Sequence, residues 1–189
     1  MGNVTVLIST TLDGFADAQH VIVDPEFFAL THSLMEKAEV AAFGRHTFEI
    51  FQERWPKRLE DKNSPEWIRK MAQDLHDMPK LVFSSTLNMT TWNKSSIVPA
   101  LDLEYITAFK KNNRGSFLTF GSISLIETLT KMNVVDDYYF NVQPVLSGKG
   151  DTRFFSKFNL ETPQALKYVD SKQQASGAHI LHYKNSSAQ

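Results

Sequence analysis

The stretch Ser116-Phe-Leu-Thr-Phe-Gly121-Ser-Ile-Ser-Leu-Ile-Glu-Thr-Leu129 predicts a strand, a turn and a helix in succession. Its first part predicts a short apolar strand, Phe117 to Phe120, and its last part predicts a helix that starts at Ser122. Gly121 lies between them and would let a ligand approach the backbone closely, because glycine has no side chain in the way. The first N–H groups of a helix have no partner within the helix, and they suit a phosphate. The stretch therefore predicts an anion-binding turn, although this geometry is common in proteins.

Further strands can be read on both sides of this stretch. Short apolar runs predict strands at 3–10, 40–43, 80–84, 96–98 and 136–144. Two alternating segments, at 165–171 and 178–183, predict a C-terminal antiparallel hairpin. Because helical patterns separate the first strands, their sheet is expected to be mostly parallel. The sequence therefore predicts an α/β fold with three layers, α/β/α, and a mixed, mostly parallel sheet.

The helices between these strands have recognisable ends. Asp24-Pro25 predicts a helix over 25–38, with aspartate as the N-cap and proline at the first position. Ser64-Pro65 predicts the same kind of start for a helix that runs to about residue 76. A helix that opens at Gly44 is expected to end before Pro56, where a charged loop begins.

Composition narrows the class of protein. The chain has 189 residues, 42% of them apolar and 22% charged, and we expect one domain over 1–184 with a loose tail at 185–189. The net charge of −1 favours neither nucleic acid nor a membrane as a partner. Cysteine is absent, which excludes disulfides and thiolate catalysis. No signal-peptide pattern or apolar run of roughly 20 residues is present, so a cytoplasmic protein is expected.

Ligands of an open α/β sheet bind beyond the carboxyl ends of its parallel strands. The residues expected there are small, hydroxylated, glycine or cationic, and they lie at Thr10-Thr11, Gly44–Thr47, Ser84–Thr86 and Gly121-Ser122. One arginine, several hydroxyls and two helix N-termini suit a nucleotide with several phosphates. The alternative is that serine and threonine are common in loops and helix caps whether or not a ligand binds. Neither the G-x-G-x-x-G fingerprint nor a P-loop is present.

Six short motifs follow one another along the chain. They are Thr-Leu-Asp-Gly (11–14), Phe-Gly-Arg-His-Thr-Phe-Glu (43–49), Val-Phe-Ser-Ser-Thr-Leu (82–87), Phe-Gly-Ser-Ile-Ser-Leu (120–125), Pro-Val-Leu-Ser-Gly-Lys-Gly (144–150) and Gly-Asp-Thr-Arg-Phe-Phe (150–155). Their order resembles the dihydrofolate-reductase superfamily. Within the superfamily, the chain is most similar to the reductase domain of the bifunctional riboflavin-biosynthesis deaminase-reductase and to its stand-alone relatives. The resemblance covers nearly the whole chain and implies a dihydrofolate-reductase-like fold, NADPH as the cofactor and a homodimer.

The resemblance also implies which residues hold NADPH. By this analogy, phosphates bind to Gly44, Arg45 and Thr47. The adenosine ribose and its 2′-phosphate lie by Ser84, Ser85 and Thr86. The pyrophosphate binds to the turn and helix start formed by Gly121, Ser122, Ile123, Ser124 and Leu125. Arg45 is also the phosphate ligand that the residues alone suggest, because a planar guanidinium binds phosphate through two nitrogens. Members of the family usually have a glycine pair where this chain has Gly121-Ser122. A serine narrows the approach to the pyrophosphate unless its backbone lies in an ordinary region.

The reaction that the resemblance implies is hydride transfer, in which the protein positions two rings and a proton is supplied by a carboxyl group or by water. Asp13 is the candidate catalytic residue, because its loop is expected at the nicotinamide end, and the alternative is a structural Asp-Gly turn. The first helix offers Phe27 and Phe28 where folate reductases have a carboxylate, so dihydrofolate itself is not the expected substrate. No metal is expected, because His179 and His182 are three apart on a strand and point to opposite faces.

We therefore expect an NADPH-dependent oxidoreductase that transfers a hydride to a small heterocyclic or carbonyl substrate, pyrimidine-like or pterin-like. By resemblance it is similar to 5-amino-6-(5-phosphoribosylamino)uracil reductase. The alternative is a nucleotide-binding protein of the same fold without turnover, in which the acid and the second glycine have been lost.

Overall fold

The computed structural model of the chain describes residues 1–22, 24–154 and 160–187. These residues divide into two compact units. The first unit comprises Met1–Gly2 and Phe28–Leu118, and the second comprises Asn3–Phe27 and Thr119–Gln189. The expectation of a single domain over 1–184 stays a prediction.

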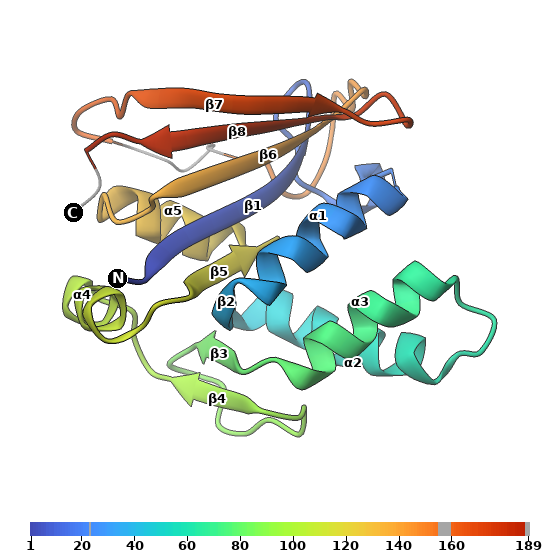
Figure 1. Cartoon of the computed structure of the whole chain (residues 1–189), viewed down its shortest axis with the longest axis horizontal. Helices are drawn as coiled ribbons and strands as arrows, with labels where there is room; N and C mark the ends of the chain where they lie inside the picture. Colours follow the sequence, from blue (N-terminus) through green and yellow to red (C-terminus); the bar gives the residue numbers. More distant parts are fainter. Residues whose placement is uncertain (23, 155–159, 188–189) are drawn as a thin grey trace. The chain divides into compact units, whose positions relative to one another are not determined.

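The first unit contains three neighbouring parallel strands with helices around them (Figure 1). The strands lie in the order β4-β3-β2 and span Ser95–Val98, Lys80–Phe83 and Ala38–Gly44. The helices of this unit are α2 (Arg45–Glu60), α3 (Glu66–Asp77), α4 (Leu103–Asn112) and most of α1 (Pro25–Glu36), which begins in the second unit. Residues 40–43 of β2 are all buried and apolar, as is typical of a parallel strand covered on both faces.

Two helix ends of the first unit differ from the prediction. Helix α2 does not end before Pro56 but continues through it to Glu60, and its C-cap Asp61 donates its backbone N–H to Lys57 O. Proline removes one hydrogen bond from a helix. Aromatic contacts stabilise this part of the helix, because the ring centroid of Trp55 lies 6.0 Å from that of Phe51 and 6.2 Å from that of Phe28.

The start of α3 is the second difference. The residue at the N-cap is Pro65, which makes no side-chain cap hydrogen bond, rather than Ser64. The Ser64 hydroxyl donates instead to the Asp61 carboxylate over 2.9 Å. The serine therefore stabilises the turn before the helix and not the helix itself.

The second unit contains four neighbouring strands in the order β1-β6-β8-β7 (Figure 1). They span Asn3–Thr11, Asp137–Gln143, His179–Asn185 and Leu166–Gln173. Strands β1 and β6 are parallel, whereas β8 runs antiparallel to both β6 and β7. The predicted C-terminal hairpin is therefore confirmed, and so is the expected α/β class with a mixed, mostly parallel sheet.

Helix α5 (Ile123–Lys131) covers the core of the second unit. Strands β1 and β6 end at the same edge of the sheet in this unit. Helix α5 buries Leu125, Ile126 and Leu129, and the Tyr138 hydroxyl of β6 donates to Thr130 Oγ1 over 3.1 Å. Strand β5 (Ser116–Phe120) leads into this helix and crosses the boundary between the units. In the parallel register Thr11 of β1 lies opposite Gln143 of β6, so the loops that follow the two strands leave from the same edge.

Two short segments complete the second unit. A 3-10 helix, η1 (Ala18–His20), lies in the loop after β1 and was not expected from the sequence. Strand β8 reaches Asn185, and the Ser187 N–H donates to Asn185 Oδ1 over 3.1 Å. The end of the expected tail, 188–189, lies outside the described residues, as does the second phenylalanine of the motif at 150–155.

Candidate functional site

Two of the predicted phosphate-binding segments lie side by side in the first unit. Gly44 ends β2 and is the N-cap of α2, and its backbone is extended, with φ −77° and ψ 161°. In the register of the parallel pair, Gly44 lies opposite Phe83, the last residue of β3. Neighbouring strands are about 4.8 Å apart. The structure therefore brings the start of α2 and the segment Ser84–Thr86 together at one edge of the sheet.

The side chain of Arg45 is available at that edge. Arg45 is the first residue of α2, its side chain is 53% exposed, and its Nη1 lies 3.3 Å from Glu49 Oε1. An exposed pair at this i,i+4 spacing contributes only about 0.3–0.5 kcal/mol. A phosphate would therefore compete easily with Glu49 for the guanidinium. Thr47, in the same turn of the helix, is half-buried.

The hydroxyl of Ser84 already serves its own turn. Ser84 Oγ accepts the backbone N–H groups of Thr86, over 3.1 Å, and of Leu87, over 2.9 Å. The side chains of Ser85 and Thr86 are exposed. Of the three predicted ribose and phosphate contacts, Ser85 and Thr86 therefore offer groups to a ligand, whereas Ser84 shapes the loop that carries them.

The predicted pyrophosphate cradle lies in the second unit. Gly121 has φ +68°, a backbone conformation that favours glycine, and its N–H donates to Leu7 O of β1 over 3.3 Å. Helix α5 follows, with Ser122 as its N-cap and the Ile126 N–H donating to Ser122 O over 2.9 Å. Ser124 is exposed, whereas the Leu125 side chain is in the core. Leu125 could therefore contribute only its backbone to a ligand.

Ser122 lies in an ordinary backbone region. Its φ is −96° and its ψ is 82°, and its side chain is only 1% exposed. The side chain is thus buried and makes no cap hydrogen bond at the helix N-terminus. This geometry removes the steric reason for a glycine at position 122, and leaves Gly121 as the one residue of the pair whose conformation favours glycine.

The carboxylate of Asp13 is held by three hydrogen bonds. Asp13 Oδ1 accepts from Thr11 Oγ1 over 2.7 Å and from the Ser147 N–H over 3.1 Å, and Oδ2 accepts from the Gly148 N–H over 2.6 Å. The bond from Thr11, followed by those from Ser147 and Gly148, lowers the pKa of Asp13 from 3.8 to about 2. These hydrogen bonds favour the ionised carboxylate, and the role of Asp13 as a proton donor stays a prediction.

The carboxylates at the start of α1 are also engaged. Asp24 accepts from the Glu26 N–H over 2.7 Å, as the predicted N-cap should, and from the Ser176 N–H over 3.2 Å. Burial alone would raise the pKa of Asp24, but the hydrogen bonds from Ser176 and Glu26 lower it overall. Glu26 accepts from the Ala175 N–H, which lowers its pKa, and pairs with Lys172 over 3.0 Å. These groups fix the turn between β7 and β8.

Asp17 and its partners were missed in the sequence. Asp17 Oδ1 accepts the backbone N–H groups of Asp151, over 2.9 Å, and of Thr152, over 3.1 Å. These contacts join residues 134 and 135 positions apart, and no local pattern signals them. The two glycines Gly148 and Gly150 were the one feature of the sequence that indicated such a contact, because a glycine often marks a place where another group approaches the backbone closely.

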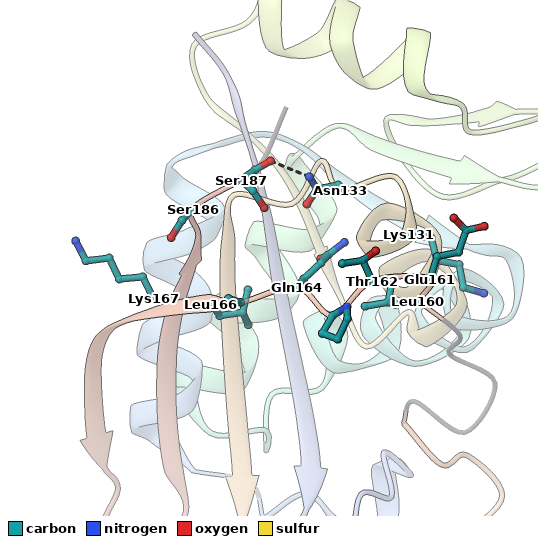
Figure 2. A pocket seen from close by; sticks show the side chains of 12 residues that line it. Lys131, Asn133, Leu160, Glu161, Thr162, Gln164, Leu166, Lys167, Ser186 and Ser187 are labelled. Carbon is teal, nitrogen blue, oxygen red and sulfur yellow. Dashed lines mark hydrogen bonds between the residues drawn. The ribbon is translucent and has the colours of Figure 1, made fainter.

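A cavity of about 920 Å³ lies elsewhere in the second unit. Figure 2 shows its lining, which includes Lys131, Asn133, Gln164, Lys167 and Ser187. None of the predicted cofactor residues contributes to it. Among the described residues no three metal-binding side chains converge, and none of their helices is long and apolar enough to cross a membrane.

Solved structures of several reductases and related proteins share this fold. A putative riboflavin biosynthesis protein from Shewanella sp. PV-4 has a TM-score of 0.70 and 18% identity, with 98% of this chain and 99% of that chain covered. For dihydrofolate reductase from Enterococcus faecalis, complexed with NADP(H) and RAB-propyl, the TM-score is 0.64 and the identity is 13%. The match covers 98% of this chain and 97% of that chain. For a pyrimidine reductase-like protein from Corynebacterium diphtheriae NCTC, the TM-score is 0.65 and the identity is 11%. The match covers 97% of this chain and 92% of that chain. The chain therefore has the dihydrofolate-reductase-like α/β fold.

The family follows from the sequence match. The chain belongs to the family of the RibD C-terminal domain, whose model matches residues 3–180. It is also 27% identical over 181 residues to the uncharacterized protein YyaP of Bacillus subtilis (strain 168), with 93% of this chain and 91% of that protein covered. The predicted membership is confirmed, and the family together with the structural neighbours supports a reductase-type function.

Proposed function

We propose that the protein is an NADPH-dependent reductase that transfers a hydride to a small heterocyclic or carbonyl substrate, pyrimidine-like or pterin-like. The observation that carries the proposal is the start of α2, where Arg45 follows a parallel strand and lies beside the loop Ser84–Thr86. A helix N-terminus, a guanidinium and exposed hydroxyls at one sheet edge are the groups that bind a ribose phosphate. The bound cofactor would supply the hydride, and the protein would supply binding and orientation.

The second unit adds a further anion site to this proposal. The left-handed backbone of Gly121 lets a phosphate approach α5, and the N–H groups at Ile123 and Ser124 lie in the first turn of that helix. Because the Ser122 hydroxyl is buried, it leaves this approach open. We assign the 2′-phosphate of NADPH to Arg45 and the Ser84–Thr86 loop of the first unit, and we propose the turn at Gly121 as an anion site of the second unit in its own right.

Substitution of Arg45 tests the assignment directly. Titration of the protein with NADPH and with NADH, followed by cofactor fluorescence, gives the two affinities. A hydrogen bond from a charged group contributes about 1.5–3 kcal/mol, so Arg45→Ala should weaken NADPH binding about 10- to 100-fold. NADH lacks the 2′-phosphate and should lose much less. The fold should be unaffected, because the lost Glu49 pair is exposed.

Arg54→Ala is the matched control for this experiment. Arg54 is an exposed arginine on the same helix, nine residues after Arg45, and its replacement should change neither affinity. Equal losses of NADPH and NADH in Arg45→Ala would move the arginine from the 2′-phosphate to the pyrophosphate. A wild-type protein that binds neither cofactor at high micromolar concentration would refute the proposal as a whole.

A second candidate function is nucleotide binding without turnover. The observation that favours it is that Asp13, Asp24 and Glu26 all accept hydrogen bonds from the backbone and are held as anions. A panel of pterins, pyrimidines and simple carbonyl compounds, assayed by NADPH absorbance, separates the two functions. Oxidation of NADPH with any of these compounds establishes the reductase, and binding without oxidation across the panel establishes the alternative.

A further inference from the structure

The cavity of about 920 Å³ in the second unit lies where helix α5 ends and strand β7 begins. Its lining comes from three parts of this unit: Lys131 and Asn133 at the end of α5, the segment 160–167, and Ser186 and Ser187 after β8. Pockets of this size hold small molecules in other proteins. The cavity is therefore a candidate for a second ligand site, because no residue that we assign to NADPH lines it.

Helix α5 separates this cavity from the proposed anion site at Gly121. The Gly121-Ser122 turn precedes the helix, whereas the cavity lies at its last residue, Lys131. The helix has nine residues, and at about 1.5 Å per residue it is about 13 Å long. A small molecule in the cavity would therefore not cover the anion site at the other end of α5.

Side-chain amides hold the walls of the cavity in place. Gln164 Nε2 donates to Thr130 O in the last turn of α5 over 2.7 Å, which ties the segment that carries Gln164 to the helix. Asn133 Nδ2 donates to Ser187 O over 2.7 Å, as Figure 2 shows. Asn133 Oδ1 also accepts from Asn185 Nδ2 over 2.8 Å. Because these bonds exist without a ligand, binding would cost little ordering of the walls.

One amide oxygen in this lining has an unmet hydrogen bond. Gln164 Oε1 is buried and has no hydrogen-bond partner among the described residues. Buried polar atoms nearly always have a partner, and an exception points to a missing donor. The last torsion of a glutamine side chain is soft, so a small turn of the amide brings Oε1 to the cavity that Gln164 lines. A ligand with an O–H or N–H group would supply the donor.

The charged side chains of the lining favour an anion. Lys131, Lys167 and Glu161 are exposed, and they give the lining two positive charges and one negative charge. Figure 2 shows the Lys167 side chain directed away from Gln164, so Lys131 is the cation that we assign to a ligand. The end of a helix repels an anion, but here Thr130 O already accepts a hydrogen bond from Gln164.

The neutral groups of the lining suit a molecule that carries several hydroxyls. Thr162 and Ser186 are exposed and offer hydroxyl groups of their own. Glu161 and Gln164 offer oxygens that accept hydrogen bonds from O–H donors. The hydroxyls of a sugar donate and accept hydrogen bonds, while its C–H groups pack against apolar side chains. The apolar side chains of the lining are Leu160, Pro163 and Leu166.

We propose that this cavity binds a small polyhydroxylated anion, such as a sugar phosphate or a sugar acid. Lys131 contacts the anionic group, whereas Gln164 and Thr162 contact hydroxyls. The site goes beyond the proposed function, because it requires neither NADPH nor a hydride transfer.

An NMR titration of the ¹⁵N-labelled wild-type protein locates the ligand, with glucose 6-phosphate, gluconate, glucose and inorganic phosphate as probes. Glucose 6-phosphate or gluconate should shift the amide resonances of Lys131, Asn133 and Gln164 saturably, and leave those of Arg45 and Gly121 in place. Glucose lacks the charge and phosphate lacks the sugar hydroxyls, so each should bind about tenfold more weakly than glucose 6-phosphate. Saturable binding of either sugar anion supports the proposal, and the tighter one identifies the anionic group.

Two substitutions separate the two halves of the contact. Lys131→Met should weaken glucose 6-phosphate about tenfold and leave glucose unchanged, because only the contact to the charge is lost. Gln164→Leu should weaken glucose 6-phosphate and glucose about fivefold each and leave phosphate unchanged. Lys149→Met is the matched control, because Lys149 is exposed on a loop of the same unit and does not line the cavity.

A third substitution covers the structural part of Gln164. This side chain also anchors its segment to Thr130 O, so Gln164→Leu can disturb the wall. Thr162→Val removes one hydroxyl and keeps that anchor. It should weaken glucose 6-phosphate and glucose alike by about two- to threefold, and leave phosphate unchanged.

Three results would overturn the proposal. Phosphate that binds as tightly as glucose 6-phosphate would mean that the lysines attract any anion, and so would an equal loss in Lys149→Met. A lack of saturable shifts around the cavity at millimolar probe concentrations would mean that such molecules do not bind there. The titration of Arg45→Ala with NADPH is independent of all three, so this proposal and the proposed function can fail separately.

Discussion

Replacing Lys80 with methionine is expected to destabilise the first unit strongly. Lys80 is 1% exposed, and its ammonium donates to Leu75 O over 2.6 Å, to Met78 O over 2.8 Å and to His76 O over 3.3 Å. These carbonyls end α3, where a cation is favoured by the helix dipole. The ammonium also lies 4.7 Å from the centroid of the Trp92 ring. Methionine fills a similar volume but donates no hydrogen bond.

The size of the effect follows from the groups left behind. Two of the three carbonyls, Leu75 O and Met78 O, are buried, and an unpaired buried acceptor costs about 1–3 kcal/mol. The loss is therefore about 2–6 kcal/mol. Removing a buried charge works in the opposite direction, because the charge no longer has to leave water on folding. We expect a net loss of about 2–4 kcal/mol in the free energy of unfolding.

Urea denaturation at pH 7, followed by circular dichroism, measures this loss. Lys94→Met is the matched control: the exposed Lys94 also donates to the end of α3, to Asp77 O, and its replacement should cost less than about 1 kcal/mol. If Lys80→Met proves as stable as the wild type, or more stable, the cost of burying the charge outweighs its hydrogen bonds and the reasoning is wrong.

The same variant has a pH signature. Burial, helped by Lys94 and opposed by Asp77, lowers the pKa of Lys80 from 10.5 to about 8. The folded pKa is thus below the unfolded one, and between these values the unfolded chain binds more protons. Stability therefore rises with pH in that window. The free energy of unfolding of the wild type should rise from pH 8 to pH 10 relative to Lys80→Met, and a constant difference would contradict the shift.

Two further substitutions test the glycine and serine positions. Gly150→Ala should destabilise the second unit by about 1–3 kcal/mol, because the new methyl group displaces Asp17 or Phe15. Thermal unfolding measures this loss. An unchanged melting temperature would mean that the loop 12–22 and the loop 144–154 separate easily. Ser122→Gly should leave NADPH affinity within about twofold, since the serine backbone is unstrained and its hydroxyl is buried. A large gain of affinity would show that the serine obstructs the pyrophosphate.

Local patterns predicted most of the elements of this chain. The apolar runs placed the strands to within one or two residues, and Asp24 caps α1 as its position before a proline indicates. Helix α2 was predicted to end before Pro56, and this error has a physical cause. The prediction considered only the hydrogen bond that a proline removes from a helix. It did not include the aromatic contacts of Trp55, which come from another turn of α2 and from another helix. A rule for a single residue does not include those contacts.

The chemistry of the carboxylates could not be predicted in the same way. The sequence placed Asp13 in a loop and left its role open between an acid and a turn. The pKa of Asp13 is lowered first by the hydrogen bond from the Thr11 hydroxyl, and then by the N–H groups of Ser147 and Gly148, which are 134 and 135 residues away. Residue type and spacing carry no information about a contact of that range, so the candidate acid could be located from the sequence but its pKa could not.

The position of these carboxylates bears on both candidate functions. Asp13 and Asp17 accept hydrogen bonds from backbone N–H groups in the loop 144–154 that follows β6. Asp24 and Glu26 accept hydrogen bonds from backbone N–H groups in the turn between β7 and β8. If hydride transfer occurs, we expect its proton to come from water or from another group, since the hydrogen bonds of Asp13, Asp24 and Glu26 lower the pKa of each of these carboxyl groups. The engaged state of Asp13 favours binding without turnover, whereas a proton supplied by water would leave the reductase able to act. It moves the question from the acid to the cofactor, and the oxidation of NADPH with the panel of pterins, pyrimidines and carbonyl compounds decides it.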